Sequence, residues 1–316
     1  MNNIFNFDKK SINIASKLLL KGDLISFATE TVYGLGADAR SDQAVSKIFK
    51  LKNRPDFNPL IVHVNSINKV FNYGCITPLA KRLAEKYWPG PLTLILERKK
   101  DCNISYLVSA GLSSIAMRIP NHKPFLDLLN LTKIPIAAPS ANKSGKLSPT
   151  SANDVKDDFG DNIKMILDDG FTSGGIESTV IDARNNYPIL LRPGLISSEE
   201  IENTLKIKFI SEEKNVIESP GQLLSHYSPN SKLIINSIYP KDNDIFLTYK
   251  DINPYKKFTG LQFNLSKKGN LEEVASNLFK MLRQVDKKNP KRIVVAPIPD
   301  VGIGKAINNR LQRASK

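Results

Sequence analysis

The chain has 316 residues, enough for about two domains with cores of their own. Hydrophobic residues make up 41% and charged residues 24% of it, which is typical of a soluble, globular protein. The formal net charge of +14 is compatible with nucleic acid, an acidic membrane surface or a polyanionic small molecule as a partner, and equally with a Lys- and Asn-rich composition that only maintains solubility. RGG, zinc-finger and RNP-type aromatic signatures are missing, which disfavours nucleic acid.

Targeting and metal signals are weak. The first ten residues, MNNIFNFDKK, lack the apolar core of a signal peptide, and no apolar run approaches ~18 residues, so we expect a cytoplasmic protein with no membrane contact. The two cysteines have no metal-type spacing, and the three histidines are far apart in the sequence. We therefore assign no metal ion to protein side chains.

Hydrophobic periodicity predicts the elements of the first two thirds of the chain. Residues 11–21 have helical spacing, residues 41–50 form an amphipathic helix with Ser41 as N-cap, and a third helix begins at Pro78. Strand-like runs occupy residues 23–30, 59–64, 92–98, 113–119, 134–140, 164–169, 178–184 and 188–194. Because helices and strands do not alternate regularly, we expect an α/β fold with a twisted mixed sheet flanked by helices, rather than a doubly wound sheet.

The composition and periodicity of the sequence change near residue 207. Residues 207–230 are polar, contain two prolines and show no sustained period, so we interpret them as a linker. Three strand-like runs, an amphipathic helix from Leu271, a further strand and a basic closing helix follow. The predicted organisation is a first domain over residues 1–206, the linker, and a small α/β domain over residues 231–316.

Two polar loops follow apolar strands. In "ATETVYGLGADA" three hydroxyl residues precede Gly34 and Gly36, which we expect to let the backbone turn sharply, although an ordinary strand-to-helix turn would have the same composition. In "APSANKSGKLSPT" small donors surround Gly145, which suits an anion or a plain polar surface loop.

Cations are expected near these loops. We place five of them at or beside strand ends: Lys50, Lys52, Arg54, Arg118 and Arg192. Arginine forks pair with phosphate oxygens, and lysines neutralise charge as points. Cations and hydroxyls that converge in one cleft would fit a bound triphosphate.

The motifs, in their order, resemble the L-threonylcarbamoyladenylate synthases of the YrdC type in their longer, two-domain form. The matching segments include "TETVYGLG", "KNRPDFNPLIVHV", "WPGPLTLIL", "APSANKSGKLSPT", "GGIESTVID", "LLRPG", "SPGQLLSHYSP" and "GIGKAINNRLQRASK". The resemblance covers nearly the whole chain, with small departures such as "ATET" where a proline commonly precedes "TET". It implies a YrdC-like twisted mixed sheet and a smaller, Rossmann-like C-terminal domain.

The resemblance also implies a reaction. L-threonine, bicarbonate and ATP would give threonylcarbamoyl-AMP and pyrophosphate, for the threonylcarbamoyl modification of adenosine 37 in tRNAs that read ANN codons. Mg²⁺ would arrive with the ATP. The expected partners are the three substrates, the tRNA threonylcarbamoyl-transfer proteins that take the product, and tRNA itself through a weak contact.

The family's site residues are carried over position by position. The catalytic set would be Lys52, Arg54, Ser140 and Asn142. The ATP-binding set would add Asn58, Ser114, Ser148, Arg192 and the linker residue Tyr227. The threonine-binding set would be Thr31, His63, Arg118, Ala138 and Ser178, with Arg118 pairing with the carboxylate of threonine. A histidine in an apolar strand is often a plain core residue, and for His63 only the resemblance favours ligand contact. The linker is expected to act as a lid over the cleft, with a passive tether as the alternative.

Two other functions remain open at this stage. A double-stranded RNA or tRNA-binding module would also use a basic face, and would bind with strong salt dependence and without ATP turnover. A carbamoyltransferase would use the same fold on carbamoyl phosphate, but it would normally carry acylphosphatase and zinc-finger-like parts, and only two cysteines are present here.

Overall fold

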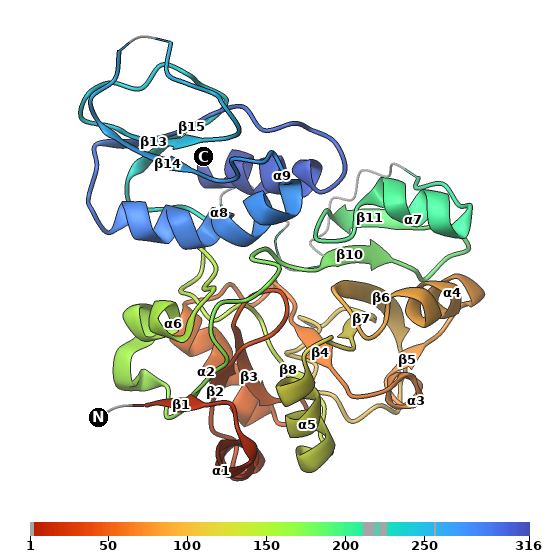
Figure 1. Ribbon diagram of the computed structural model, residues 1–316. Coiled ribbons are helices and arrows are strands. Elements are labelled where there is room, and N and C mark those ends of the chain that lie inside the picture. The colour runs from red at the N-terminus through yellow and green to blue at the C-terminus, as the bar shows by residue number, and fades with distance from the viewer. Residues whose placement is uncertain (1–2, 211–218, 220, 222–225, 256) are drawn as a thin grey trace.

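The computed structural model describes residues 3–210, 219, 221, 226–255 and 257–316. The N-terminal two thirds of these residues form one layered body and the C-terminal residues form a second, smaller body that packs against it (Figure 1). Most of the predicted linker, and with it the lid prediction, lies outside the described residues. The positions of the domain boundaries stay predictions.

A mixed sheet organises the first body. In spatial order its strands are β1 (Ile4–Asn6), β9 (Ile166–Asp168), β2 (Ile25–Phe27), β3 (Gly34–Asp38), β8 (Ile136–Ala137), β4 (Ile61–His63), β7 (Ser114–Arg118), β6 (Leu92–Arg98), β10 (Thr179–Asp182) and β11 (Ile189–Arg192), with β5 (Gly74–Cys75) beside β6. Parallel and antiparallel pairs are both present, as in β4–β7 and β6–β7. The predicted mixed sheet is confirmed.

Helices cover this sheet, and two of them, α2 and α4, begin where the sequence signals place them, whereas α1 begins at Lys9, two residues before the predicted start. Ser41 caps its helix by accepting a hydrogen bond from the backbone N–H of Ala44, and Pro78 is the first residue of α4. The helices are α1 (Lys9–Leu20), α2 (Asp42–Lys52), α3 (Ile67–Val70), α4 (Pro78–Tyr87), α5 (Lys123–Thr132), α6 (Ala152–Phe159) and α7 (Ser198–Leu205), with a 3₁₀ turn at Gly160–Asn162.

The second body contains a fully parallel sheet. Its strand order is β12 (Lys232–Ile234), β15 (Arg292–Val295), β13 (Ile245–Thr248) and β14 (Leu261–Asn264). The helices α8 (Leu271–Asp286) and α9 (Gly304–Ala314) bury apolar faces against it. This is the small α/β domain that the sequence predicts.

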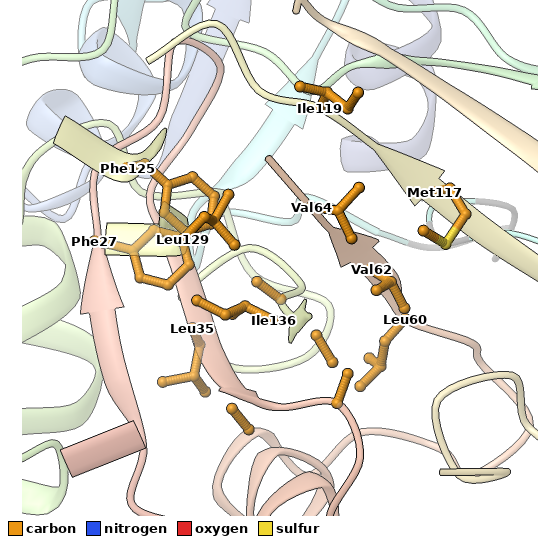
Figure 2. Packing of buried hydrophobic residues seen from close by; sticks show 14 of the residues in the cluster. Phe27, Leu35, Leu60, Val62, Val64, Met117, Ile119, Phe125, Leu129 and Ile136 are labelled. Atoms are coloured by element: carbon orange, nitrogen blue, oxygen red, sulfur yellow. The ribbon is translucent and has the colours of Figure 1, made fainter. Parts of the chain in front are cut away.

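The core of the first body fixes the strands beneath the site. Phe27 on β2 stacks on Phe125 of α5 with ring centroids 4.0 Å apart, Leu129 and Ile136 lie beside the pair, and the same core continues to Val62 of β4 and Met117 of β7 (Figure 2). All of these side chains are nearly inaccessible to solvent. Tight packing of this kind holds neighbouring polar side chains in fixed positions.

Two expectations from the sequence are wrong in detail. Gly34 and Gly36 lie inside strand β3 and make no turn; an added Cβ at Gly36 would lie 2.4 Å from the Phe27 ring, so these glycines allow the ring to approach the strand. Lys50 and Lys52 lie in the last turn of α2 and not at a strand end.

No helix within the described ranges has the length and apolar character that a bilayer crossing requires.

Candidate active site

A cavity enclosing about 580 Å³ of empty space, its open mouth included, lies at the ends of several central strands. Residues from both the first body and the described part of the linker surround it: Phe27, Thr29, Thr31, Val32, Gly34, Arg54, Ile61, His63, Arg118, Ala138, Pro139, Ser140, Glu177, Ser178, Arg192, Gly221, His226 and Tyr227.

The parallel pair β4–β7 places a histidine and an arginine side by side at one end of the cavity. His63 and Arg118 are register partners and are the last residues of their strands. Burial, and then Arg118, lower the pKa of His63 to about 3, so its imidazole is neutral. His63 Nδ1 is buried and has no hydrogen-bond partner among the described residues. A buried polar atom in this condition at a cavity wall is suited to a ligand contact.

Arg118 is held in place by three groups. Its Nη2 lies 2.6 Å from Glu30 Oε1, its Nη1 donates to Thr31 Oγ1 at 3.1 Å, and its Nε donates to the Gly90 carbonyl at 3.2 Å. Thr31 Oγ1 also lies 2.8 Å from Thr29 Oγ1. The guanidinium that the sequence assigned to the threonine carboxylate therefore pairs with Glu30 in this structure.

A second group of cations faces the cavity further along. Arg54 is buried; it donates to the Asn58 carbonyl at 3.0 Å, to Asn58 Oδ1 at 2.7 Å and to the Pro59 carbonyl at 2.8 Å. Burial, and then Arg192, lower the pKa of Arg54 to about 9. Burial also lowers the pKa of Arg192, which donates to the Ser178 carbonyl. Two buried guanidinium groups that line the same cavity create a positive electrostatic potential there, which favours an anionic ligand.

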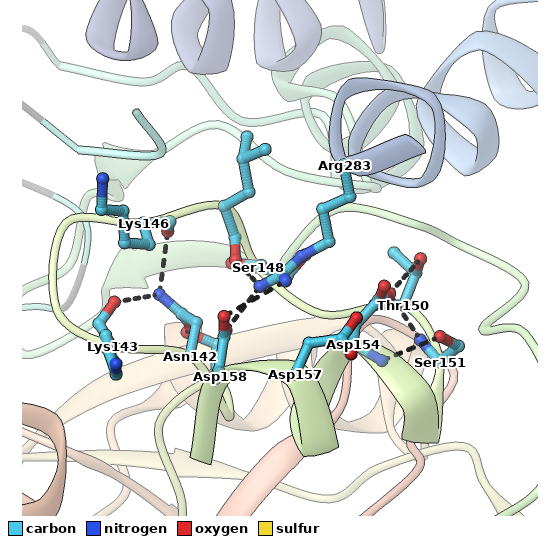
Figure 3. A network of polar contacts seen from close by, with 12 residues as sticks. Asn142, Lys143, Lys146, Ser148, Thr150, Ser151, Asp154, Asp157, Asp158 and Arg283 are labelled. Carbon is cyan, nitrogen blue, oxygen red and sulfur yellow. Dashed lines mark hydrogen bonds and ion pairs between the residues drawn. The ribbon is translucent and has the colours of Figure 1, made fainter. Parts of the chain in front are cut away.

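Lys52 holds the backbone of the loop that contains Ser140 and Asn142. Its Nζ donates to the Ser140 carbonyl at 2.6 Å and to the Asn142 carbonyl. Burial, and then Arg54, lower its pKa well below the usual lysine value. Ser140 Oγ donates to Asn142 Oδ1 at 2.6 Å, and Asn142 Nδ2 donates to the carbonyls of Lys143 and Lys146 (Figure 3). Lys52 and Asn142 thus fix the loop that presents Ser140 to the cavity.

The structure brings most of the predicted site residues to one cavity. Nine of them line it: Thr31, Arg54, His63, Arg118, Ala138, Ser140, Ser178, Arg192 and Tyr227. Five lie outside the lining: Lys52, Asn58, Ser114, Asn142 and Ser148. Their roles stay predictions.

The predicted ATP and threonine sets are not separated in the cavity wall. Arg192 of the ATP set donates to the backbone carbonyl and the hydroxyl of Ser178, a member of the threonine set. Ser114 is the first residue of β7, about 13 Å along the strand from Arg118. Ser148 is fully buried, and its hydroxyl donates to Glu177.

Sequence reasoning missed Glu177 as a lining residue, and with it Thr29 and His226 as members of the site. Glu177 directly precedes Ser178, and His226 directly precedes Tyr227, so adjacency to predicted residues was the available signal. Burial lowers the pKa of His226 to about 3. Within the described ranges, His, Cys, Asp and Glu do not gather in threes as a metal site requires.

Comparison with known proteins identifies the family of this chain. A family model for the Sua5, YciO and YrdC proteins, described as "Telomere recombination", matches residues 17–194. A second model, described as "Threonylcarbamoyl-AMP synthase, C-terminal domain", matches residues 196–316. The chain belongs to the Sua5/YciO/YrdC family. The second match shows that it has the long, two-domain form of that family.

Two curated relatives of the Sua5/YciO/YrdC family match over nearly their whole length. The threonylcarbamoyl-AMP synthase of Pyrococcus abyssi is 38% identical over 96% of this chain and 94% of its own. That of Bacillus subtilis is 38% identical over 95% of this chain and 92% of its own. The crystal structure of P. abyssi Sua5 complexed with L-threonine superposes with a TM-score of 0.88 at 36% identity, covering 100% of this chain and 97% of the other.

Proposed function

We propose that this protein is a threonylcarbamoyl-AMP synthase that makes L-threonylcarbamoyl-AMP and pyrophosphate from L-threonine, bicarbonate and ATP. One observation carries the proposal: three buried arginines, Arg54, Arg118 and Arg192, converge with hydroxyl side chains on a single cavity. That cavity lies in a chain similar throughout to proteins named for this activity, one of which has been crystallised with L-threonine.

Two groups of lining residues suit two different substrates. The neutral His63 and the Thr29–Thr31 hydroxyls suit the hydroxyl and carboxylate of threonine, with Arg118 exchanging Glu30 for the substrate. Arg54 and Arg192 suit the triphosphate of ATP. The Ser140 loop, held by Lys52, would add small donors next to the phosphates.

A shared cavity also suits the chemistry. The amine of threonine forms a carbamate with carbon dioxide or bicarbonate, and this carbamate is short-lived in water. Its oxygen then attacks the α-phosphate of ATP, and pyrophosphate leaves. Holding the three reactants together makes the encounter effectively unimolecular, and the arginines stabilise the charge that develops on the leaving group. ATP would enter as its Mg²⁺ complex, with the metal bound to phosphate oxygens.

The wider setting follows from the same proposal. The labile adenylate would pass to tRNA threonylcarbamoyl-transfer proteins, for adenosine 37 of tRNAs reading ANN codons. The protein would work in the cytoplasm, with a weak contact to tRNA. The +14 charge is compatible with such a contact.

A pyrophosphate-release assay tests the proposal. Release should require threonine and bicarbonate together, whereas an RNA-binding module would release none and a carbamoyltransferase would respond to carbamoyl phosphate. Release that is indifferent to threonine would overturn the assignment.

Substrate analogues test the threonine end separately. A site that hydrogen-bonds the threonine hydroxyl should reject valine by about 10⁴-fold, because polar groups are then left unpaired, and should reject serine by only about 10- to 200-fold for the missing methyl. Comparable turnover of valine and threonine would contradict a threonine pocket.

A further inference from the structure

One carboxylate lines the cavity that the proposed function assigns to a polyanion. Glu177 is buried and is the only acidic residue in the described part of the cavity wall. Its Oε1 accepts a hydrogen bond from Ser148 Oγ at 2.5 Å, and its Oε2 accepts one from Arg310 Nε at 3.0 Å. An uncompensated carboxylate here would repel the phosphates of a nucleotide.

The partner of Glu177 comes from the other body of the molecule. Arg310 lies on α9, is 1% exposed, and does not itself line the cavity. Its Nη1 donates to the Pro193 carbonyl at 2.6 Å, one residue after Arg192. Its guanidinium carbon lies 5.5 Å from the centroid of the Tyr227 ring, which does line the cavity.

Packing alone does not account for an arginine at this position. Its neighbours on the buried face of α9, Ile307 and Leu311, are apolar members of the C-terminal core. Burying a guanidinium costs several kcal/mol, and an apolar residue would fill the same space without that cost. Arg310 Nη2 is also left without a hydrogen-bond partner among the described residues. The buried charge of Arg310 therefore has an electrostatic role at the cavity wall and not a packing role.

The pKa of Glu177 shows which charge Arg310 compensates. Burial acts to raise the pKa of Glu177, but Arg310, followed by Arg192 and the Ser148 hydroxyl, lowers it below its usual value. The carboxylate is thus ionised, and Arg310 is its first source of compensation. Arg192 is the second source, although it is also a predicted nucleotide contact.

We propose that Arg310 is a positioning residue through which the C-terminal domain prepares the nucleotide end of the cavity. It neutralises Glu177 and holds that carboxylate toward the Ser148 hydroxyl, so that the cavity wall presents no uncompensated negative charge to the ligand. The assignment of the ligand as ATP rests on the proposed function. Without Arg310, the buried carboxylate of Glu177 would oppose the phosphates.

A charge-rescue experiment tests this role. Binding of α,β-methylene-ATP is measured by calorimetry, and the KM values for ATP and threonine are measured by pyrophosphate release. Arg310→Met should weaken analogue binding and raise the KM for ATP by about 10- to 100-fold, the usual range for breaking a charge-assisted contact, and should leave the KM for threonine within about twofold. The double variant Glu177→Gln/Arg310→Met should recover most of the loss, because the repelling charge is gone.

A second interdomain ion pair on α9 provides the matched control. Lys305 pairs with Glu199 of α7, and both side chains are nearly half exposed. Lys305→Met should leave both KM values unchanged, because this pair does not touch the cavity. If Arg310→Met folds poorly by circular dichroism, Arg310→Lys replaces it; this change keeps the charge, loses the fork, and should give an intermediate KM for ATP.

The outcomes separate the two proposals. A double variant as weak as Arg310→Met, or equal losses for ATP and threonine, would overturn the role of Arg310 and would leave the enzyme assignment standing. Wild-type protein that neither binds the analogue nor releases pyrophosphate would overturn the proposed function, whatever the variants do.

Discussion

Arg54 is the residue on which the proposed triphosphate contact depends most directly. Its buried guanidinium lines the cavity, while Lys50, four residues earlier on α2, is exposed. Arg54→Ala should lower kcat/KM for ATP by about 10- to 100-fold or more, because a charge-assisted fork is lost. Lys50→Ala should change it less than about twofold. Pyrophosphate release measures both effects.

A second variant of Arg54 distinguishes the loss of a ligand contact from the loss of the fold. Arg54→Ala strips the donor from the Asn58 and Pro59 carbonyls, which are buried acceptors. Arg54→Lys keeps the charge and should be impaired in turnover with an unchanged circular dichroism spectrum. Should Lys50→Ala prove the more damaging of the two alanine changes in a folded protein, the assignment of Lys52 and Arg54 as the catalytic cations would be wrong.

His63 links the site to stability against acid. Its pKa is about 3 in the folded chain and 6.5 in the reference state, so below pH 6.5 the unfolded chain binds a proton that the folded chain does not. The stability of the neutral state is therefore complete above pH 6.5 and is lost as the pH falls toward 3, by about 1.4 kcal/mol per pH unit. Between pH 6.5 and 5.0, the free energy of unfolding measured in urea should fall by about 1.6 kcal/mol more in wild type than in His63→Asn. The same fall in both proteins would show that His63 is protonated in the folded protein over this pH range.

At the scale of elements, strand β3 depends on glycine to accommodate the ring of Phe27 from β2. An added Cβ at Gly36 would lie 2.4 Å from Phe27 Cε1 and 3.0 Å from Ile136 Cγ2. Gly36→Ala should lower the free energy of unfolding by about 1–3 kcal/mol, the usual cost of overpacking, as measured in urea. Phe27→Leu should relieve part of this cost, so the double variant should be less destabilised than the sum of the single changes. Strict additivity would place the strain elsewhere.

Strand β3 also shows which kind of element could not be predicted from the sequence. Long elements such as α2, α4, α8 and β6 could be located from their periodicity, because each buries one face or runs fully inside the core. β3 could not, because "GLGAD" has the composition of a turn, and its role depends on Phe27, a residue of another strand. Two-residue strands such as β5 are too short to show any period.

The candidate site could be predicted where its residues lie in recognisable sequence motifs. Arg54, Ser140 and Ser178 lie in motifs that the resemblance aligned, and the structure brings them to one cavity. Glu177 was missed because its significance comes from Arg310, 133 positions later on α9. A pairing of that kind depends on how the two bodies dock, which local sequence does not encode.

At the scale of the whole molecule, two ion pairs join α8 to α6, and they differ in burial. Arg283 donates to the carbonyls of Leu147 and Ser148 and lies 2.7 Å from Asp158 Oδ2, with both side chains of the ion pair largely buried (Figure 3). Lys287 pairs with Asp157 at 2.5 Å, and those two side chains are 59% and 48% exposed. The buried pair should therefore fix the docking of the C-terminal body, and the exposed pair should add little.

Neutralising each cation separates these contributions. Arg283→Met leaves Asp158 and two carbonyl groups without their donor, and should lower the free energy of unfolding by about 3–5 kcal/mol. Lys287→Met, one turn away on the same helix, should cost less than about 1 kcal/mol, because its ion pair is exposed to solvent. Calorimetry should show one cooperative transition for wild type and Lys287→Met, and an earlier transition of the C-terminal body for Arg283→Met. Equal losses in the two variants would mean that apolar packing, and not the buried arginine, holds the two bodies together.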